Sequence, residues 1–200
     1  MSDLVKIAKI EISNSNKLCV IAGLNVLEDD QLTFEVAERL KKITEAQGNS
    51  FIFKASFDKA NRSSVDSYRG PGLEKGLEIF RELKKSDYQL ITDIHEISQV
   101  EQISEVVDII QIPAFLCRQT DLIKEACQSG KPLNIKKGQF LSPDQMKNII
   151  EKCSNFGNDQ IMLCERGTSF GYDNLVVDML GMSKLKTFNC PIIFDVTHSL

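Results

Sequence analysis

The sequence predicts an α/β fold, a TIM (β/α)₈ barrel that carries an N-terminal β-hairpin and is truncated after its seventh strand. Short apolar, β-branched runs alternate with helical patterns along the whole chain, as expected of βα units. The runs are nearly continuously apolar, which favours parallel strands covered on both faces. The length of 200 residues favours a single barrel domain over residues 1–200.

Each element has its own local signal. A small hairpin is predicted from residues 5–13 and the following residues 15–18, where it could close the bottom of a barrel. The strands are predicted at 18–23, 51–56, 89–94, 107–113, 133–137, 160–165 and 192–196.

Helical patterns stand between these strands. After the first strand, one helical face carries apolar side chains and Gly48 ends the helix; these side chains are Leu32, Val36, Leu40 and Ile43. Residues 73–83 repeat the pattern with Leu73, Leu77, Phe80 and Leu83. Residues 142–145 read Ser-Pro-Asp-Gln, which predicts a helix start with a capping box.

The rival architecture is an open, doubly wound sheet that binds a dinucleotide. Its glycine-rich fingerprint is absent after the first strand, where residues 22–29 read AGLNVLED, so the barrel is favoured. A complete barrel typically needs about 250 residues. We therefore expect the eighth strand and the last helices to be missing, either because the chain is a fragment or because the missing part is supplied in another way.

Composition excludes several classes of protein. The hydrophobic share of 42% and charged share of 26% fit a soluble globular chain, and the net charge of −4 gives no reason to expect nucleic-acid binding. The apolar runs are too short or interrupted to span a membrane, and the first residues lack a secretory signal, so a cytoplasmic location is expected. The six cysteines form no CxxC pair, which predicts reduced core thiols and excludes a zinc ribbon.

Polar side chains follow the ends of the predicted strands, where a barrel places its active site. These residues are Asn25, Lys54, Asp93, His95, Gln111, Lys136, Arg166, Asp195 and His198, and the loop after the second strand adds Lys59, Asn61, Arg62 and Ser63. Five of them are cations in an otherwise acidic chain, and such a concentration is costly unless anions complete it. Phosphate and carboxylate are the expected ligands. The alternatives are an Arg166 paired with Glu165, lysines paired within the core, and loop charges that are merely solvated.

Several segments are recognisable. They are FKASFDKANRSS (53–64), SYRGPG (67–72), TDIHE (92–96), QIPAFLCRQTDL (111–122), NIKKGQF (134–140), CERGTSFGYDNLVVDML (164–180) and FDVTHSL (194–200). They closely resemble the 3-deoxy-D-manno-octulosonate 8-phosphate synthases, also called 2-dehydro-3-deoxyphosphooctonate aldolases, through the whole chain and in the family's order. Residues 138 and 168–169 depart from the pattern of close relatives, and the acidic residues of the family's last strand are absent.

The resemblance implies a transferase that condenses phosphoenolpyruvate with D-arabinose 5-phosphate and releases phosphate, for lipopolysaccharide biosynthesis. It implies a cytoplasmic homotetramer whose partners are these two small molecules, without nucleic acid or membrane. Lys54, Lys59, Lys136 and Arg166 match positions that bind phosphoenolpyruvate, with Ser56, Gln111 and Gln139 nearby. Asn61, Arg62 and Ser63 match the loop that receives arabinose 5-phosphate. His198 matches the histidine beside the reacting carbons, and Lys59 or His198 would assist proton movement.

The resemblance also bears on metal use. Metal-dependent members place a cysteine in the first strand's loop, and Asn25 occupies that position here. An amide oxygen is a weak ligand for a soft divalent site, so the metal-independent class, with no metal and no cofactor, is expected. Asn25 is then a catalytic-site residue without a metal. Two rivals stay open: the sister synthase that uses erythrose 4-phosphate, and a non-catalytic, anion-binding barrel fragment.

Overall fold

The fold is α/β, as predicted, in a computed structural model that describes residues 2–199. The barrel-type strands are β3 (Cys19–Gly23), β4 (Ser50–Lys54), β5 (Leu90–Asp93), β6 (Ile109–Ile112), β7 (Leu133–Lys136), β8 (Ile161–Glu165) and β11 (Ile192–Phe194). Their hydrogen-bonded order is β11-β8-β7-β6-β5-β4-β3. Each of the seven strands predicted from the sequence is present, in an arrangement consistent with the seven-stranded part of a (β/α)₈ barrel.

The chain divides into two compact units. Unit 2 comprises residues 17–110, and unit 1 comprises residues 2–16 together with residues 111–199. The single barrel domain predicted over residues 1–200 stays a prediction, and each unit is described below by itself.

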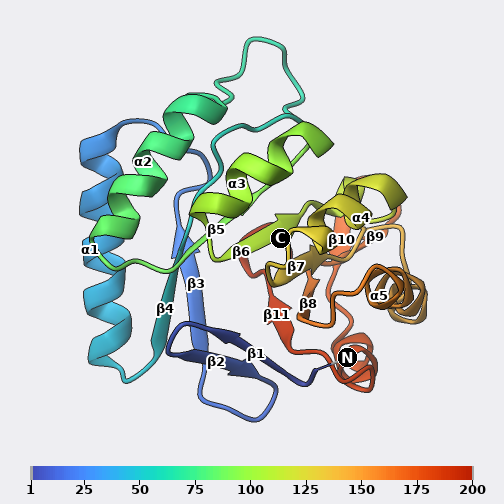
Figure 1. Ribbon diagram of the computed structural model, residues 1–200. Coiled ribbons are helices and arrows are strands. Elements are labelled where there is room, and N and C mark those ends of the chain that lie inside the picture. Colours follow the sequence, from blue (N-terminus) through green and yellow to red (C-terminus); the bar gives the residue numbers. More distant parts are fainter. Residues whose placement is uncertain (1, 200) are drawn as a thin grey trace. The chain divides into compact units, whose positions relative to one another are not determined.

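Unit 2 holds β3, β4 and β5 with three helices. β3 pairs with β4 and β4 with β5, both parallel. The helices are α1 (Asp30–Ala46), α2 (Leu73–Lys85) and α3 (Val100–Val106). Helix α1 runs beside β3 and β4, and α2 packs against α3 (Figure 1).

Helix α1 packs through a different stripe from the one predicted. Its buried residues are Thr33, Ala37 and Thr44, whereas Ile43 is half exposed. Leu32, Val36 and Leu40 are only partly buried. The small side chains of the buried stripe let the helix approach the strands closely, and the larger apolar residues flank that contact. Helix α2 buries Leu77, Phe80 and Leu83, as its pattern predicts, whereas Leu73, its first residue, is only partly buried.

Unit 1 holds the N-terminal hairpin and the later strands. β1 (Leu4–Ile7) and β2 (Ile10–Ser13) pair antiparallel, which confirms the predicted hairpin. Asn14 fastens it to the start of β11, because its side-chain amide donates to the Cys190 carbonyl (2.8 Å) and accepts from the Ile192 N–H (2.9 Å). β7 pairs with β8 and β8 with β11, both parallel.

The helices of unit 1 are α4 (Thr120–Gln128), α5 (Met146–Asn155) and α6 (Met179–Lys186). The predicted capping box precedes α5: the Ser142 N–H donates to Gln145 Oε1 at 2.9 Å, and a 3₁₀ turn over Pro143–Gln145 leads into the helix. Within the described residues, no helix is long and apolar enough to cross a membrane.

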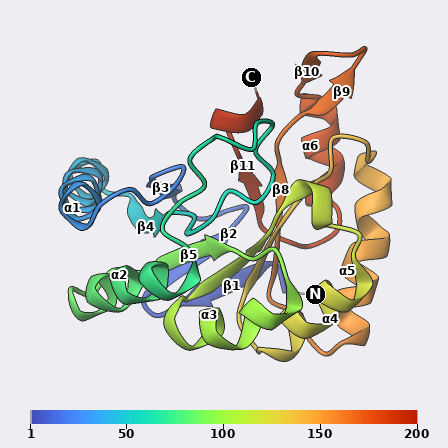
Figure 2. The ribbon, with the colours of Figure 1, turned by 90° about the horizontal axis from the view of Figure 1, so that it is seen from above.

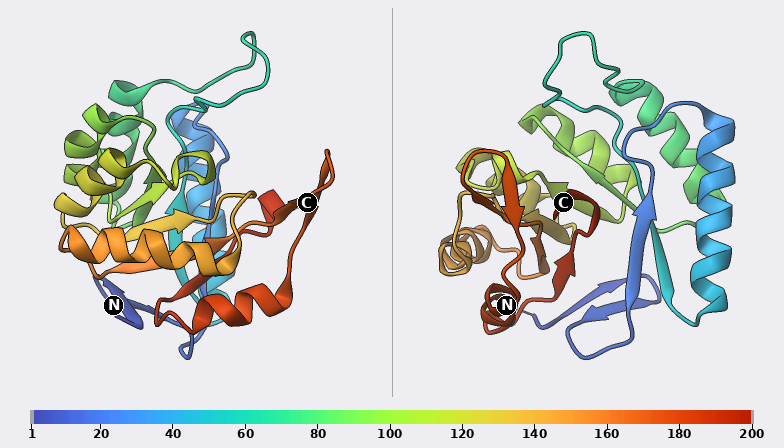
Figure 3. Two further views of the ribbon diagram at one scale, coloured as in Figure 1. Left: turned by 90° about the vertical axis from the view of Figure 1, so that its right-hand side faces the viewer. Right: turned by 180° about the vertical axis from the view of Figure 1, so that it is seen from behind.

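A second hairpin in unit 1 was not predicted. β9 (Thr168–Phe170) and β10 (Asn174–Val176) pair antiparallel directly after β8, and the hairpin projects away from that strand (Figure 2 and Figure 3). Its strands are three residues each and mostly exposed, so they lack the apolar run by which the longer strands are recognised.

Candidate active site

The carboxyl end of β4 is joined to the loop that follows β3, within unit 2. The Leu24 N–H donates to the Lys54 carbonyl and the Leu27 N–H to the Ser56 carbonyl, both at 2.9 Å. Asn25 stands between these two backbone contacts and is exposed. The sequence prediction that Asn25 and Lys54 belong to the same edge of the strands is therefore confirmed within this unit.

The Asp93 carboxylate interacts with Lys54, Lys59 and His95 within unit 2. Asp93 Oδ2 is 3.4 Å from His95 Nε2, and the Asp93 side chain is 7% exposed. Burial by itself would raise the pKa of Asp93, but the hydrogen bond with His95 and the charges of Lys54 and Lys59 outweigh it and lower that pKa below its usual value. Asp93 therefore carries a negative charge at neutral pH and partly balances two of the predicted substrate-binding lysines.

Lys59 and Ser56 form a direct contact. Lys59 Nζ donates to Ser56 Oγ at 2.9 Å, and Ser56 is fully buried. The His95 ring meets the Phe57 ring edge-on, with centroids 5.8 Å apart. The Lys59–Ser56 hydrogen bond therefore orders the loop after β4, and the ring contact of Phe57 with His95 joins this loop to the chain after β5.

The long loop 55–72 carries the predicted sugar-phosphate residues. Asn61, Arg62 and Ser63 are all exposed, and Arg62 Nε donates to the Tyr68 carbonyl at 3.2 Å. Gly70, near the end of the loop, has a φ of +123°, and a Cβ there would overlap the Phe57 carbonyl oxygen. Glycine is required at this point because the backbone is left-handed and passes close to its neighbour.

Lys136, Asp195 and His198 form a chain of contacts in unit 1. Lys136 Nζ lies 2.5 Å from Asp195 Oδ2, and His198 Nδ1 lies 2.9 Å from the same oxygen. Burial acts to raise the pKa of Asp195, but hydrogen bonds from His198 and Lys136 lower it below its usual value. Lys136 is therefore paired with Asp195, which also lies at a strand end. The same Asp195 carboxylate fixes the orientation of the His198 ring.

Arg166 lies directly after β8 and is not paired with Glu165. Its Nε and Nη1 are buried without a hydrogen-bond partner among the described residues. Glu165 Oε1 instead accepts the backbone N–H groups of Arg166 (2.9 Å) and Gly167 (2.7 Å) and lies 3.4 Å from Lys137 Nζ. Buried polar groups are normally satisfied, so an unpartnered guanidinium favours an anionic ligand.

Two glutamines complete the predicted residues of unit 1. Gln111 is 4% exposed on β6. Gln139 follows β7, and its Oε1 is buried without a partner among residues 2–199. The Ser169 N–H donates to the Gln139 carbonyl at 3.0 Å, which ties the loop after β7 to the chain after β8.

The sequence alone does not assign a role to every residue of these groups. Asp93, His95 and Asp195 stand at predicted strand ends without an assigned role, and no sequence motif gives a role to Lys137. Strand alternation indicates a separate environment for Lys137, because two adjacent lysines at the end of a strand point to opposite sides.

No group of three or more histidine, cysteine, aspartate or glutamate side chains with the geometry of a metal site is found within residues 2–199. Metal independence, inferred from Asn25, stays a prediction.

Proteins similar to this chain are known over almost its whole length. The sequence model of the DAHP synthetase I family matches residues 3–200. A protein of Hahella chejuensis named 2-dehydro-3-deoxyphosphooctonate aldolase is 56% identical over 197 residues, covering 98% of this chain and 70% of the relative. Proteins of the same name from Pasteurella multocida (56%) and Haemophilus influenzae strain PittEE (55%) match over 200 residues with the same coverage.

Proposed function

Because this chain belongs to the DAHP synthetase I family, we propose that it condenses phosphoenolpyruvate with D-arabinose 5-phosphate and water to give 3-deoxy-D-manno-octulosonate 8-phosphate and inorganic phosphate. Relatives that are 55–56% identical over 98% of this chain bear the name 2-dehydro-3-deoxyphosphooctonate aldolase. The product is a precursor for lipopolysaccharide.

The observation that carries the proposal is that the buried Nε and Nη1 of Arg166 have no hydrogen-bond partner among residues 2–199. Arg166 lies two residues beyond Cys164, which is the register partner of Lys136 on the neighbouring strand. The two cations therefore follow the ends of adjacent parallel strands, and a phosphate dianion supplies the acceptors that Arg166 lacks.

The reaction joins two anions that repel each other. The C3 carbon of phosphoenolpyruvate attacks the sugar aldehyde carbon, water adds at C2, and the tetrahedral intermediate loses phosphate by C–O cleavage. We assign the departing phosphate to Arg166 and Lys136. The family resemblance assigns the carboxylate to Lys54 and further binding roles to Ser56, Gln111 and Gln139. Their contribution is positioning together with stabilisation of charge that grows as phosphate leaves.

The sugar phosphate is assigned to the exposed loop of unit 2. Arg62 offers a guanidinium to the phosphate of arabinose 5-phosphate, with Asn61 and Ser63 beside it in the sequence. Lys59, which donates to Ser56, supplies a cation near the aldehyde oxygen.

His198 is oriented for proton movement. Its Nδ1 contacts both oxygens of Asp195 at 2.9 and 3.0 Å, which leaves Nε2 as the ring atom available to substrate. A carboxylate on Nδ1 fixes the orientation of the ring, as in other general acid–base sites.

Three properties complete the proposal and come from the family resemblance and from Asn25. The enzyme works without a metal, because Asn25 stands where a thiolate ligand would be needed. It works in the cytoplasm, and it assembles as a homotetramer.

The decisive experiment is a substrate comparison. Purified protein is incubated with phosphoenolpyruvate and either arabinose 5-phosphate or erythrose 4-phosphate, and released phosphate and product mass are measured. We expect phosphate release with the five-carbon sugar and a product of the eight-carbon mass. Faster turnover of erythrose 4-phosphate would favour the sister synthase, and binding of phosphoenolpyruvate without turnover would favour an anion-binding fragment.

A further inference from the structure

The two lysines that follow each other at the end of β7 have different partners. Lys136 Nζ lies 2.5 Å from Asp195, and Lys137 Nζ lies 3.4 Å from Glu165 Oε1. Successive side chains of an extended chain point to opposite sides, which explains the separation. The Lys137 and Glu165 side chains are 1% and 3% exposed, so this second pair is the more deeply buried one.

Lys137 is surrounded by oxygen atoms. Its Nζ donates to Thr168 Oγ1 at 2.9 Å and to the carbonyl oxygens of Leu141 and Gly167, each at 3.4 Å. A buried ammonium group needs such partners, because leaving it unpaired is costly. The contacts join the end of β7 to the turn after β8, and this turn contains Arg166.

Glu165 holds that turn from its other side. Its Oε1 accepts the N–H groups of Arg166 and Gly167 at 2.9 and 2.7 Å, and Gly167 has a φ of +92°. The carboxylate therefore lies next to the backbone of Arg166, while the Arg166 side chain has two nitrogens without a partner among the described residues. A carboxylate so close to an arginine is its natural competitor for an anionic substrate.

We propose that Lys137 is a positioning residue that neutralises Glu165 and thereby leaves the Arg166 guanidinium available for the phosphate of phosphoenolpyruvate. The inference rests on the proposed function, in which Arg166 binds that phosphate. Lys137 touches no substrate in this scheme. It acts through Glu165, because a Glu165 carboxylate without its cation would pair with Arg166 instead.

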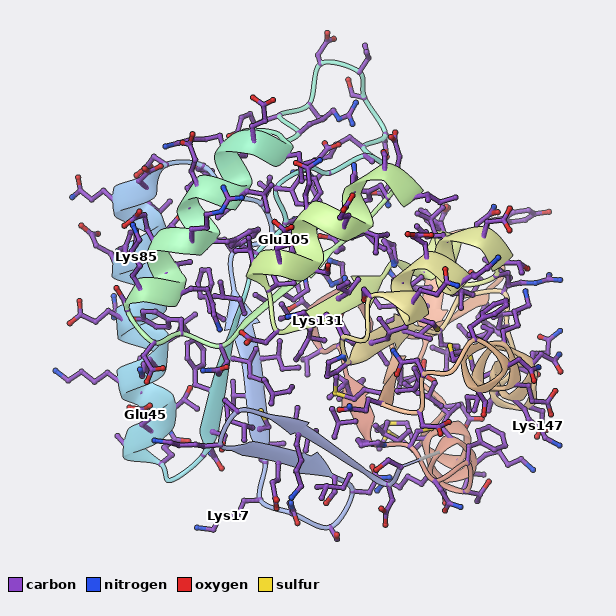
Figure 4. The ribbon with its side chains drawn as sticks, in the orientation of Figure 1. Lys17, Glu45, Lys85, Glu105, Lys131 and Lys147 are labelled. Carbon is purple, nitrogen blue, oxygen red and sulfur yellow. The ribbon has the colours of Figure 1, made fainter. Side chains whose placement is uncertain are left out.

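The test uses four variants: Lys137→Met, Glu165→Gln, the double variant, and Lys147→Met as a control. Lys147 lies on the outer side of α5 (Figure 4), is 65% exposed and faces Glu151 across one helical turn at 3.8 Å. It therefore matches the chemical change of Lys137→Met without touching Glu165. Calorimetry gives the Kd for phosphoenolpyruvate, and steady-state assays give the KM for each substrate.

We expect Lys137→Met to raise the Kd and KM for phosphoenolpyruvate at least tenfold and to leave the KM for arabinose 5-phosphate within twofold. Glu165→Gln keeps an oxygen for both N–H groups and stays within threefold of wild type. The double variant recovers most of the lost affinity, because no carboxylate remains to capture Arg166. A purely structural role predicts no such recovery, and Lys147→Met should not change any of these constants.

Two outcomes overturn the inference: an unchanged Kd for phosphoenolpyruvate in Lys137→Met, or a double variant no better than Lys137→Met. If Lys137→Met does not fold, the double variant is compared with Glu165→Gln, and a tenfold weaker Kd in the double variant contradicts the mechanism. Wild-type protein that binds phosphoenolpyruvate without turnover refutes the proposed function alone, and the binding ratios still decide the role of Lys137. Wild-type protein that does not bind phosphoenolpyruvate refutes both.

Discussion

Replacing Lys136 with methionine should lower both the stability and the rate, because Lys136 forms an ion pair and, in the proposed function, also binds phosphate. Its Nζ is 2.5 Å from Asp195 Oδ2, and the two side chains are 8% and 16% exposed. At an effective dielectric constant of about 20, the Coulomb attraction at this separation is about 7 kcal/mol. Desolvation of both groups offsets most of it. A net value of about 1.5–3 kcal/mol, typical of hydrogen bonds to charged groups, is therefore expected.

That loss corresponds to a Tm lower by about 3–12 °C for a chain of this size. Methionine retains most of the apolar stem, so little of the effect comes from lost packing. The rate should fall on the order of 10²-fold, because the contact with phosphate strengthens as the phosphate departs.

A double-mutant cycle with Asp195→Asn separates the two roles. In the double variant neither charge is left buried alone, so its free energy of unfolding should exceed the additive value by about 1.5–3 kcal/mol. The rate should stay low, since the phosphate ligand is still missing. Guanidinium unfolding and steady-state kinetics measure the two quantities. Additive free energies would refute the ion pair, and a near-normal rate in Lys136→Met would remove Lys136 from the phosphate site.

The remaining predictions concern other parts of the molecule. Arg62→Ala should weaken the binding of arabinose 5-phosphate by about 1.5–3 kcal/mol, because we assign to this exposed side chain one contact with the sugar phosphate. Calorimetry should show unchanged binding of phosphoenolpyruvate, and equal losses for both ligands would contradict this. A chelator should not change the rate, because Asn25 replaces the thiolate ligand, and loss of activity that zinc or manganese restores would contradict it. Wild type should be more stable than Asp93→Asn, with the full difference in free energy of unfolding above about pH 4 and a smaller difference at lower pH. The reason is that a carboxyl group whose pKa is lowered on folding loses its contribution to stability as the pH falls below its unfolded pKa. Urea unfolding between pH 3 and 7 tests this, and a constant difference would count against it. Gly70→Ala should lower stability by about 1–3 kcal/mol, since its φ is +123° and the added Cβ meets the Phe57 carbonyl; an unchanged Tm would contradict the strained turn.

The strand pattern was predictable because burial on both faces leaves a direct trace in the sequence. The run at 133–137 forms β7 (Leu133–Lys136), and all four of its residues are buried. The outer strands β3 and β11 are less buried than predicted, because each has a neighbouring strand on one side only in the described order. The helical stripe of α1 was misplaced because small residues, which carry little hydrophobic signal, make its closest contact.

Strand ends located most of the candidate site, but pairing was beyond the reach of the sequence. Glu165 is adjacent to Arg166 in the chain, so a pair between them was a natural alternative. The structure places the carboxylate with Lys137, which comes from another strand. Such a choice depends on the register of β7 against β8, where Lys136 is opposite Cys164, and no spacing within one segment encodes it.

The two hydrogen bonds of the Asn14 side chain affect the order of folding during synthesis. Its amide joins the fourteenth residue to positions 190 and 192, which are 176 and 178 residues further along. At about 5–20 residues per second, the ribosome needs roughly 9–35 s to supply that partner. A two-stranded hairpin is only marginally stable by itself. Val5 and Ile7, which are buried in the folded chain, therefore stay exposed to solvent until the rest of the chain is made. The hairpin β1–β2 is therefore made well before the residues that fix it in place.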